Sequence, residues 1–304
     1  MYFNKTLSFF SAAVLSLGLA ACGGGNNSTS SGDNSNAAPP VAASGSSASQ
    51  QAPAASGEDS LARIKAAGKI RIGVFGDKPP FGYVDANGKS QGFDVEIAKD
   101  MAQDLLGSPD KVEFVLTEAA NRVEYLKSGK VDLILANFTK TPERAEVVDY
   151  AAPYMKVALG VVSPKNAPIT DIAQLKDKTL LVNKGTTADA FFSKNHPDIK
   201  TLKFDQNTET FDALKDGRGA ALAHDNALLR AWAKENPDFE VGIGNLGEPE
   251  FIAPAVQKGD AALLAWVNDE MAKIKQDGRL KAAYEKTLLP VYGDKVPASA
   301  LLAE

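Results

Sequence analysis

The segment from Val131 to Arg144 carries residues whose types and spacing suit the capture of a carboxylate. Residues 133–136 form an apolar run that predicts a buried strand. Thr141 followed by Pro142 is the pattern of a helix N-cap and first helical residue. Arg144 would then lie in the first helical turn, facing unpaired backbone N–H groups and the positive end of the helix dipole.

A bound anion would relieve that unfavourable position of Arg144. The guanidinium can grip a carboxylate through two N–H groups, and the backbone N–H groups of residues 137–139 can add hydrogen bonds. The alternative is a surface arginine paired with Glu143 or Glu146. This segment alone leaves both interpretations open.

A second helix start is expected at Thr186 and Thr187. Thr186 with Asp189 fits a capping box, and a capped helix start also presents N–H groups to an anion, so a structural and a binding interpretation can hold together. Lys184-Gly185-Thr186 resembles the end of a phosphate loop, but the upstream glycine pattern is missing. Nucleotide binding is therefore not expected.

Asp225 follows the strand expected at residues 220–223, where it could cap the helix expected from about residue 227. His196 and His224 are far apart in the sequence, and no His, Asp and Glu set has the spacing of a metal site. His224 could line a cleft or be a satisfied histidine at a strand end. We expect no metal and no cofactor.

The N-terminus predicts export and lipidation. Lys5 precedes an apolar stretch, residues 7–19, that is too short to span a bilayer comfortably, so residues 1–21 are expected to be a signal peptide. Leu19-Ala20-Ala21-Cys22 resembles the bacterial lipobox, in which the cysteine is diacylated; the alternative is a cysteine merely near an ordinary cleavage site. We expect a lipid-anchored protein of the cell envelope, without disulfides because Cys22 is the only cysteine.

Composition separates a spacer from a folded region. Residues 23–57 are mostly Gly, Ser, Asn, Ala and Pro, which is typical of a disordered spacer after the lipidated residue 22. The remainder of the 304 residues is long enough for two lobes. A net charge of −5 and the lack of a basic run argue against nucleic acid as a partner.

Strand-like and helix-like segments alternate after the spacer, which is the pattern of an α/β fold. Because helices connect the first strands, we expect those strands to be parallel. The expected strands are residues 69–75, 111–116, 131–136, 157–162, 179–183, 201–204, 220–223, 239–243 and 251–256. The expected helices are a short one capped by Ser60 and residues 95–105, 121–127, 188–194, 209–215, 227–234, 261–276 and 280–287.

From about residue 61 to residue 287, the chain resembles the family 3 solute-binding proteins of bacterial amino-acid ABC importers. Six motifs in the same order carry the resemblance: Pro79-Pro80-Phe81-Gly82-Tyr83, Gly92-Phe93-Asp94-Val95-Glu96-Ile97-Ala98, Val131-Asp132 through Arg144, Asp149-Tyr150-Ala151-Ala152-Pro153-Tyr154, Lys184-Gly185-Thr186-Thr187 and His224-Asp225. Within the family, the chain is most similar to the branch that binds cysteine, cystine or acidic amino acids.

The resemblance implies a periplasmic-binding-protein type II fold, with two α/β lobes joined by two crossover strands. Lobe 1 would comprise residues 58–154 and 252–304, and lobe 2 residues 159–247. Residues 155–158 and 248–251 would be the hinge strands. The ligand would lie in the cleft, and hinge closure around it would signal the loaded state to the permease.

The resemblance also implies roles for individual residues. It places Arg144 on the α-carboxylate of the ligand, together with the N–H groups of Thr139 and Thr187. Asp225 matches the aspartate that binds the ligand ammonium, where the Asn137 carbonyl and the Thr139 hydroxyl would also contribute. The other residues of the expected site are Phe75, Arg122, Ala136, Phe138 and Thr186.

Three of these side chains would contact the side chain of the ligand. Arg122 matches the position where acidic-ligand members hold a side-chain carboxylate, and the alternative is a solvated arginine at a helix start. Phe75 and Phe138 are expected as apolar walls. Lys78 stands where many relatives have an aromatic residue, a departure that removes the aromatic lid and favours a more polar pocket.

The expected function is the capture of a free L-amino acid outside the cytoplasmic membrane and its delivery to an ABC permease, without chemistry. Cysteine is the first choice of ligand, followed by cystine and then by glutamate or aspartate. We expect a monomer. Two alternatives remain: an enzyme on the same scaffold, such as a cyclohexadienyl dehydratase, and a surface antigen or adhesin.

Overall fold

The computed structural model describes residues 60–293 and 296–303. The expected signal peptide, Cys22 and the spacer up to residue 57 lie outside these residues. In the described part of the chain, no helix combines the length and the apolar character needed to cross a membrane.

The first lobe is built on a five-stranded sheet in the order β5-β1-β6-β13-β7. β1 pairs in parallel with both β5 and β6, as expected for the first strands of the chain. β13 is antiparallel to β6 and β7 because the chain enters this part of the sheet on its return from the second lobe. The strands are β5 (Val112–Leu116), β1 (Ile70–Val74), β6 (Leu133–Ile134), β13 (Ala255–Gln257) and β7 (Val148–Tyr150).

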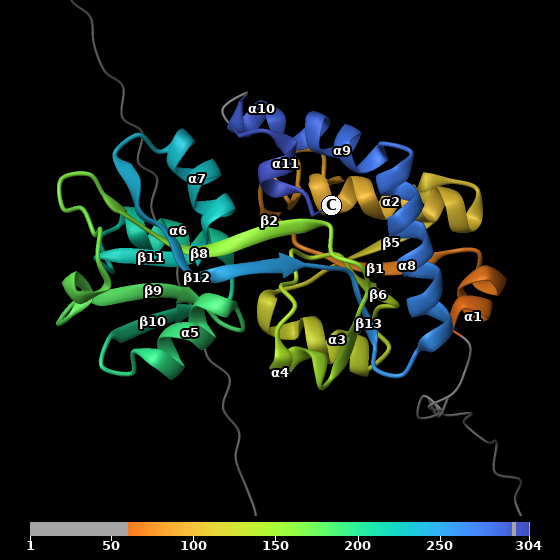
Figure 1. The fold of residues 1–304 in the computed structure, drawn as a ribbon, viewed down its shortest axis with the longest axis horizontal. Helices are drawn as coiled ribbons and strands as arrows, with labels where there is room; N and C mark the ends of the chain where they lie inside the picture. The colour runs from red at the N-terminus through yellow and green to blue at the C-terminus, as the bar shows by residue number, and fades with distance from the viewer. Residues whose placement is uncertain (1–59, 294–295, 304) are drawn as a thin grey trace, which may run out of the picture. The chain divides into compact units, whose positions relative to one another are not determined.

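Helices cover both faces of this sheet, with α2 and α9 on one side of β1 and α3 and α4 on the other (Figure 1). Helix α2 forms because apolar residues such as Val95, Ala98 and Met101 recur at helical spacing and are fully buried. It ends at Gly107, which adopts the left-handed φ of 80° that glycine permits. The helices are α1 (Ser60–Ala67), α2 (Phe93–Leu106), α3 (Arg122–Lys127), α4 (Pro142–Ala145), α8 (Ala261–Gln276), α9 (Arg279–Thr287), α10 (Leu289–Tyr292) and α11 (Ala298–Leu301).

The second lobe contains a five-stranded sheet in the order β10-β9-β11-β8-β12. β9 is parallel to β10 and β11, whereas β8 is antiparallel to β11 and to β12. The strands are β10 (Lys200–Phe204), β9 (Thr179–Asn183), β11 (Ala221–Asp225), β8 (Met155–Pro164) and β12 (Phe239–Ile252). The helices are α5 (Thr187–Asn195), α6 (Asn207–Lys215) and α7 (Asn226–Glu235).

β8 and β12 are the two crossover strands, and both run between the two sheets (Figure 1). They pair over almost their whole length, from Pro164 opposite Phe239 to Met155 opposite Ile252. Ile252 also forms a bridge with Thr139, which lies just beyond β6. The crossover therefore ends beside the segment that carries the expected carboxylate-binding residues.

Short elements were missed by the sequence patterns. A small sheet of β2 (Asp77–Lys78), β3 (Gly82–Val84) and β4 (Ser90–Gln91) was not predicted, and neither were β7, α10 and α11. Strands of two or three residues cannot show an alternation of apolar and polar residues. The strand predicted at residues 131–136 is paired as β6 only at Leu133–Ile134, although single hydrogen bonds to β1 continue on both sides of it.

Asp132 anchors the start of β6 to β1. Its buried carboxylate accepts the backbone N–H of Arg71 at 2.8 Å and a side-chain N–H of Arg63 at 2.8 Å, and it also pairs with the Arg71 guanidinium. Burial alone would raise the pKa of Asp132, but the hydrogen bonds from Arg71 and Arg63 outweigh it and lower that pKa. These contacts fix the strand that leads into the site.

Replacing Asp132 with alanine is expected to lower the free energy of unfolding by about 2–4 kcal/mol, because two arginines lose their shared partner. Urea denaturation followed by circular dichroism measures this. The exposed Asp212, which pairs with Lys215, offers a matched control, and Asp212→Ala should cost less than about 1 kcal/mol.

The stabilisation should also depend on pH. Since the folded state lowers the pKa of Asp132, its contribution is complete above the unfolded-state pKa of about 3.9 and is lost as the pH falls through the folded-state value. Wild type should therefore lose more stability than Asp132→Asn between about pH 5 and pH 3. Equal losses would contradict the assignment.

Candidate functional site

The first-lobe half of the candidate site is the segment that follows β6. Asn137 has a positive φ of 44°, which asparagine tolerates better than most residues. Its backbone N–H donates to Asp94 Oδ2 at 2.8 Å, and the hydroxyl of Tyr154 donates to Asp94 Oδ1 at 2.8 Å. Burial raises the pKa of Asp94 to about 7, against the effect of these two hydrogen bonds. Asp94 thus holds the turn that carries Asn137, Phe138 and Thr139.

Arg122 lies buried beneath this turn. Its guanidinium donates to the carbonyls of Ala119 at 3.0 Å, Ala136 at 3.0 Å and Asn137 at 3.2 Å, and it reaches Gly185 of the second lobe at 3.2 Å. Four of the five N–H groups of the guanidinium therefore have backbone acceptors. The alternative of a solvated arginine is wrong because the residue is only 3% exposed. Its expected contact with a ligand carboxylate stays a prediction.

Two phenylalanine rings flank the arginines. The Phe138 centroid lies 4.3 Å from the Arg122 guanidinium carbon and 4.8 Å from that of Arg144. The Phe75 centroid lies 5.6 Å from Arg122. Burial, followed by the charge of Arg144, lowers the pKa of Arg122 to about 9. The ring faces and the carbonyls offset part of the repulsion between the two cations.

Arg144 projects from α4, and Thr141 caps this helix by accepting the Arg144 N–H at 3.3 Å. The expected cap is confirmed, but the helix is only four residues long, so its dipole is smaller than the sequence argument assumed. The guanidinium donates to the carbonyls of Thr139 at 2.7 Å and Gly185 at 2.9 Å. The alternative of a surface ion pair is wrong, because among the described residues the guanidinium forms none.

The second-lobe half begins at Gly185 and the start of α5. Thr186 Oγ1 accepts the Asp189 N–H at 3.2 Å and donates to the Asn183 carbonyl at 2.7 Å. The Asp189 carboxylate accepts from Gly185 N rather than from Thr186 N, so the expected capping box is only half formed. Thr187 is the first residue of the helix, where backbone N–H groups lack helical acceptors.

The two lobes also meet through backbone at Gly185. A Cβ built on Gly185 would lie 2.6 Å from Ala120 Cα and 2.9 Å from Ala120 N, both in the first lobe. Gly185 also has a φ of 71°, a value that favours glycine. The absence of a side chain therefore allows the lobes to approach until the Gly185 carbonyl reaches Arg122 and Arg144.

Asp225 ends β11 and is buried at the lobe interface. Its side chain makes no cap hydrogen bond to α7, so the interpretation of Asp225 as only a helix cap is wrong. Its Oδ2 instead accepts from the ammonium of Lys78 in the first lobe at 2.9 Å, and Lys78 also donates to Asn137 Oδ1. Burial opposes the charged carboxylate, but the charge of Lys78 holds the pKa of Asp225 far below its ordinary value.

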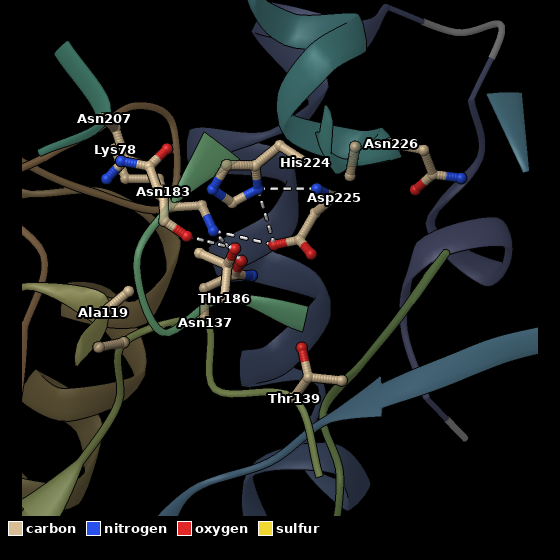
Figure 2. A network of polar contacts seen from close by, with 12 residues as sticks. Lys78, Ala119, Asn137, Thr139, Asn183, Thr186, Asn207, His224, Asp225 and Asn226 are labelled. Carbon is tan, nitrogen blue, oxygen red and sulfur yellow. Dashed lines mark hydrogen bonds and ion pairs between the residues drawn. The ribbon is translucent and has the colours of Figure 1, made fainter. Parts of the chain in front are cut away.

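His224, Asn183 and Asn137 surround this ion pair, and Figure 2 shows them with Lys78 and Asp225 in one network. The backbone N–H of Asp225 donates to His224 Nδ1 at 2.7 Å. Four buried side-chain atoms of the described residues have no hydrogen-bond partner: Asn137 Nδ2, Asn183 Nδ2, Asn183 Oδ1 and His224 Nε2. Buried polar groups in proteins are rarely left unpaired.

A cavity of about 870 Å³ opens between α4 and the start of α5. Its lining includes Arg144, Thr186 and Thr187, together with Leu159 and Glu250. Burial, followed by the charge of Asp225, raises the pKa of Glu250. The remaining expected site residues are each at most 4% exposed: Phe75, Arg122, Ala136, Asn137, Phe138, Thr139 and Asp225. A ligand that touches both the residues lining the cavity and these buried residues would be enclosed by the closed lobes.

A further contact between the lobes involves Asp77. Its carboxylate accepts the backbone N–H groups of Asn207 at 2.7 Å and Thr208 at 3.3 Å, and the Asn207 side chain at 3.0 Å. Asp77 thereby satisfies the first N–H groups of α6 from the opposite lobe. This contact stabilises the closed arrangement away from the cavity.

Several of these residues were not predicted from the sequence. Lys78 was noted only as a departure from an aromatic residue and Asp94 only as part of a motif, because the burial of these charged side chains is visible only in the folded structure. Asn183 and Asp77 gave no signal, because their neighbours come from distant parts of the chain. Among the described residues, no group of His, Cys, Asp and Glu is arranged to hold a metal ion.

Known proteins are similar to this chain in sequence, and two of the solved structures are also similar in fold. A crystal structure of the solute receptor for L-cysteine from Neisseria gonorrhoeae is 84% identical, with a TM-score of 0.80 over 80% of this chain and 99% of that chain. A cysteine-binding protein from Campylobacter jejuni is 59% identical, with a TM-score of 0.80 over 81% of this chain and 99% of that one. A glutamine-binding protein of an ABC transporter from Bacillus subtilis is 36% identical over 238 residues, which are 77% of this chain and 86% of that protein.

Residues 70–289, which include both sheets, all of the expected ligand contacts and the crossover strands, match a single family. The chain belongs to the bacterial extracellular solute-binding proteins, family 3.

Proposed function

We propose that this protein is the substrate-binding component of an ABC importer and that it binds a free L-amino acid, cysteine by first choice, between its lobes. The observation that carries the proposal is a cation and a buried anion at one closed interface: Arg144 lines the cavity, and the charge of the buried Asp225 acts on its guanidinium, so the two could hold the two ends of a zwitterion. The similarity to L-cysteine receptors supports the choice of ligand.

In this proposal the α-carboxylate binds Arg144 and the N–H groups of Thr139 and Thr187. Arg144 lines the cavity, and Thr187 opens α5 where backbone N–H groups are available. To receive the carboxylate, the guanidinium would exchange a carbonyl acceptor for a charged one, which makes a stronger hydrogen bond.

The ligand ammonium would bind the carboxylate of Asp225, with the Thr139 hydroxyl and the Asn137 carbonyl as further acceptors. Asp225 is charged and buried, and Lys78 is its present cation. A buried carboxylate requires a cationic partner, so the ligand ammonium can bind Asp225 beside Lys78.

The use of Arg122 bears on which amino acid binds. Its guanidinium holds three carbonyls of the first lobe and one of the second, which leaves little capacity for a side-chain carboxylate. We therefore rank cysteine and cystine ahead of glutamate and aspartate, and we assign to Arg122 the positioning of residues 136–137. Phe75 and Phe138 then support the two arginines and form the apolar side of the site.

The remaining parts of the proposal concern the whole protein. Residues 58–154 and 252–304 would move against residues 159–247, bending at residues 155–158 and 248–251. The closed form would dock on the permease. Lipidation of Cys22 would tether a monomer to the membrane. The groups that could act as acid or base are used to bind the amino acid, so we propose transport without chemistry.

A thermal-shift screen of the twenty amino acids and cystine, with a reductant for the cysteine sample, tests the proposal. A ligand at 100 times its dissociation constant adds about 2.7 kcal/mol of stability, which gives a clear rise in melting temperature. Calorimetry then measures affinity and stoichiometry, and chromatography of the released ligand shows that it is unchanged. If no amino acid raises the melting temperature, the proposed function is wrong.

Replacing Arg144 with alanine should weaken amino-acid binding by about ten- to a hundredfold or more, because a charged hydrogen-bond partner of the carboxylate is lost. Calorimetry measures the change. Arg218→Ala is the matched control, since Arg218 also lies over a ring, that of Phe204, but in the second lobe away from the cavity. Unchanged affinity in Arg144→Ala would refute the assignment.

Replacing Gly185 with alanine should weaken binding by at least about tenfold, because the new methyl group would meet the Ala120 backbone before the lobes close. Gly217→Ala is a matched control, since Gly217 has a φ of 70° and nothing within 4 Å of its would-be Cβ. Both variants carry similar backbone strain, so only lobe closure separates them. Small-angle scattering with and without ligand should show closure in Gly217→Ala alone.

A further inference from the structure

A cluster rich in hydrogen-bond donors lies beside the carboxylate of Asp225. Lys78, Asn137, Asn183 and His224 come from both lobes and are only 1–2% exposed. The ammonium of Lys78 donates two of its three N–H groups to Asn137 and Asp225, and Figure 2 shows these contacts at the centre of the network. The roles proposed above leave the other polar atoms of these side chains without a function.

The protonation state of His224 follows from its neighbours. Its Nδ1 accepts the backbone N–H of Asp225 at 2.7 Å, so the proton of the neutral ring is on Nε2. Burial, followed by the charge of Lys78, lowers the pKa of His224 and keeps the ring neutral. The distance of 3.5 Å from Nδ1 to Asp225 Oδ2 is therefore not an ion pair. The Nε2–H is a buried donor without an acceptor.

Donors outnumber acceptors among the unpaired atoms. His224 Nε2, Asn137 Nδ2 and Asn183 Nδ2 are donors, and Lys78 has an N–H to spare, whereas Asn183 Oδ1 is the one unpaired acceptor among the buried side-chain atoms of the described residues. A buried donor left unpaired is unfavourable, because it has lost its hydrogen bonds to water. A group that accepts several hydrogen bonds would satisfy the cluster.

The charges around Lys78 also favour an anionic group in this cluster. The titratable groups that act on it are Asp225, Arg122, Asp94 and the neutral His224. When the ammonium of an amino acid also binds Asp225, two cations share one carboxylate. An anion placed next to Lys78 would compensate the extra positive charge.

We propose that Lys78, His224 Nε2–H and the amides of Asn137 and Asn183 form the subsite for the ligand side chain, and that cysteine binds there as the thiolate. The inference rests on the proposed function. The side chain of an α-amino acid begins one carbon away from the ammonium group, so a ligand held at Asp225 reaches this cluster. The S–H bond breaks, the sulfur keeps the electron pair, and the proton passes to the buffer.

A thiolate subsite explains how the protein can separate cysteine from serine. A thiol with a pKa of about 8.5 loses its proton readily next to a buried ammonium, whereas a serine hydroxyl does not. Four donors directed at a hydroxyl would leave several unpaired, which makes serine a poor substitute.

Proton release on binding tests the inference. Calorimetric titrations of wild-type protein with L-cysteine and with L-serine at pH 7, in buffers of different ionisation enthalpy, give the protons released by each ligand. Because free cysteine is almost wholly protonated at this pH, we expect about one more proton released with cysteine than with serine. Asp94, His224 and Lys78 can change protonation when either ligand binds. Subtracting the proton release measured with serine from that measured with cysteine removes this contribution of the protein.

Two further readouts on wild type accompany this difference. The affinity for cysteine should rise about tenfold per pH unit between about pH 6 and pH 8, whereas the affinity for S-methylcysteine should not. The ultraviolet band of a thiolate should appear in the complex at pH 7. No extra proton and no thiolate band would overturn the inference and leave the proposed function intact, whereas failure of every amino acid to bind would refute the proposed function.

Variants test whether Lys78 and His224 cause the proposed binding of the thiolate. Lys78→Met should weaken cysteine binding by about tenfold or more and reduce the extra proton release at pH 7, because the thiolate loses its cation. Lys184→Met is the matched control, since Lys184 pairs with Asp205 at 2.8 Å but is exposed. If Lys78→Met does not fold, His224→Phe serves instead, and it should narrow the preference for cysteine over serine. Full proton release in Lys78→Met would overturn the role of the lysine.

Discussion

The buried carboxylate of Asp225 is the constraint on which the closed structure depends. A charged group removed from water must have a cation and hydrogen-bond donors, and Asp225 finds the cation on the opposite lobe in Lys78. The same requirement makes Asp225 suitable for a ligand ammonium, because the protein already stabilises a positive charge at this point. In the proposed function, closure and ligand binding therefore depend on the same carboxylate.

The arginines on the other side of the interface follow a different rule. Arg122 and Arg144 both lie close to the ring of Phe138, and both donate to the Gly185 carbonyl from the other lobe. Neutral carbonyls accept these hydrogen bonds without cancelling the positive charge. The positive charge therefore stays available for an anion, as the proposed function requires of Arg144, which lines the cavity.

Much of the fold and part of the site could be predicted from the sequence. The spacing of apolar residues predicted α2 and α8 well, because a helix shows its buried face every three or four residues. Thr141 as a cap was also correct. β6 was predicted too long, and the small sheet containing Lys78 was missed, because very short strands leave no pattern. The ligand contacts themselves rest on the resemblance and remain proposals.

The sequence by itself determined which residues could hold charge and where helices and strands begin, because capping and periodicity are local properties. Only the tertiary structure decided which charges meet. Lys78 and Asp225 are 147 residues apart, and Arg122 and Gly185 are 63 apart, so no local pattern connects them. Their contacts exist because two crossover strands bring the lobes together. Once these polar and charged side chains are buried at the interface, they need hydrogen-bond or ionic partners, because they can no longer bond to water.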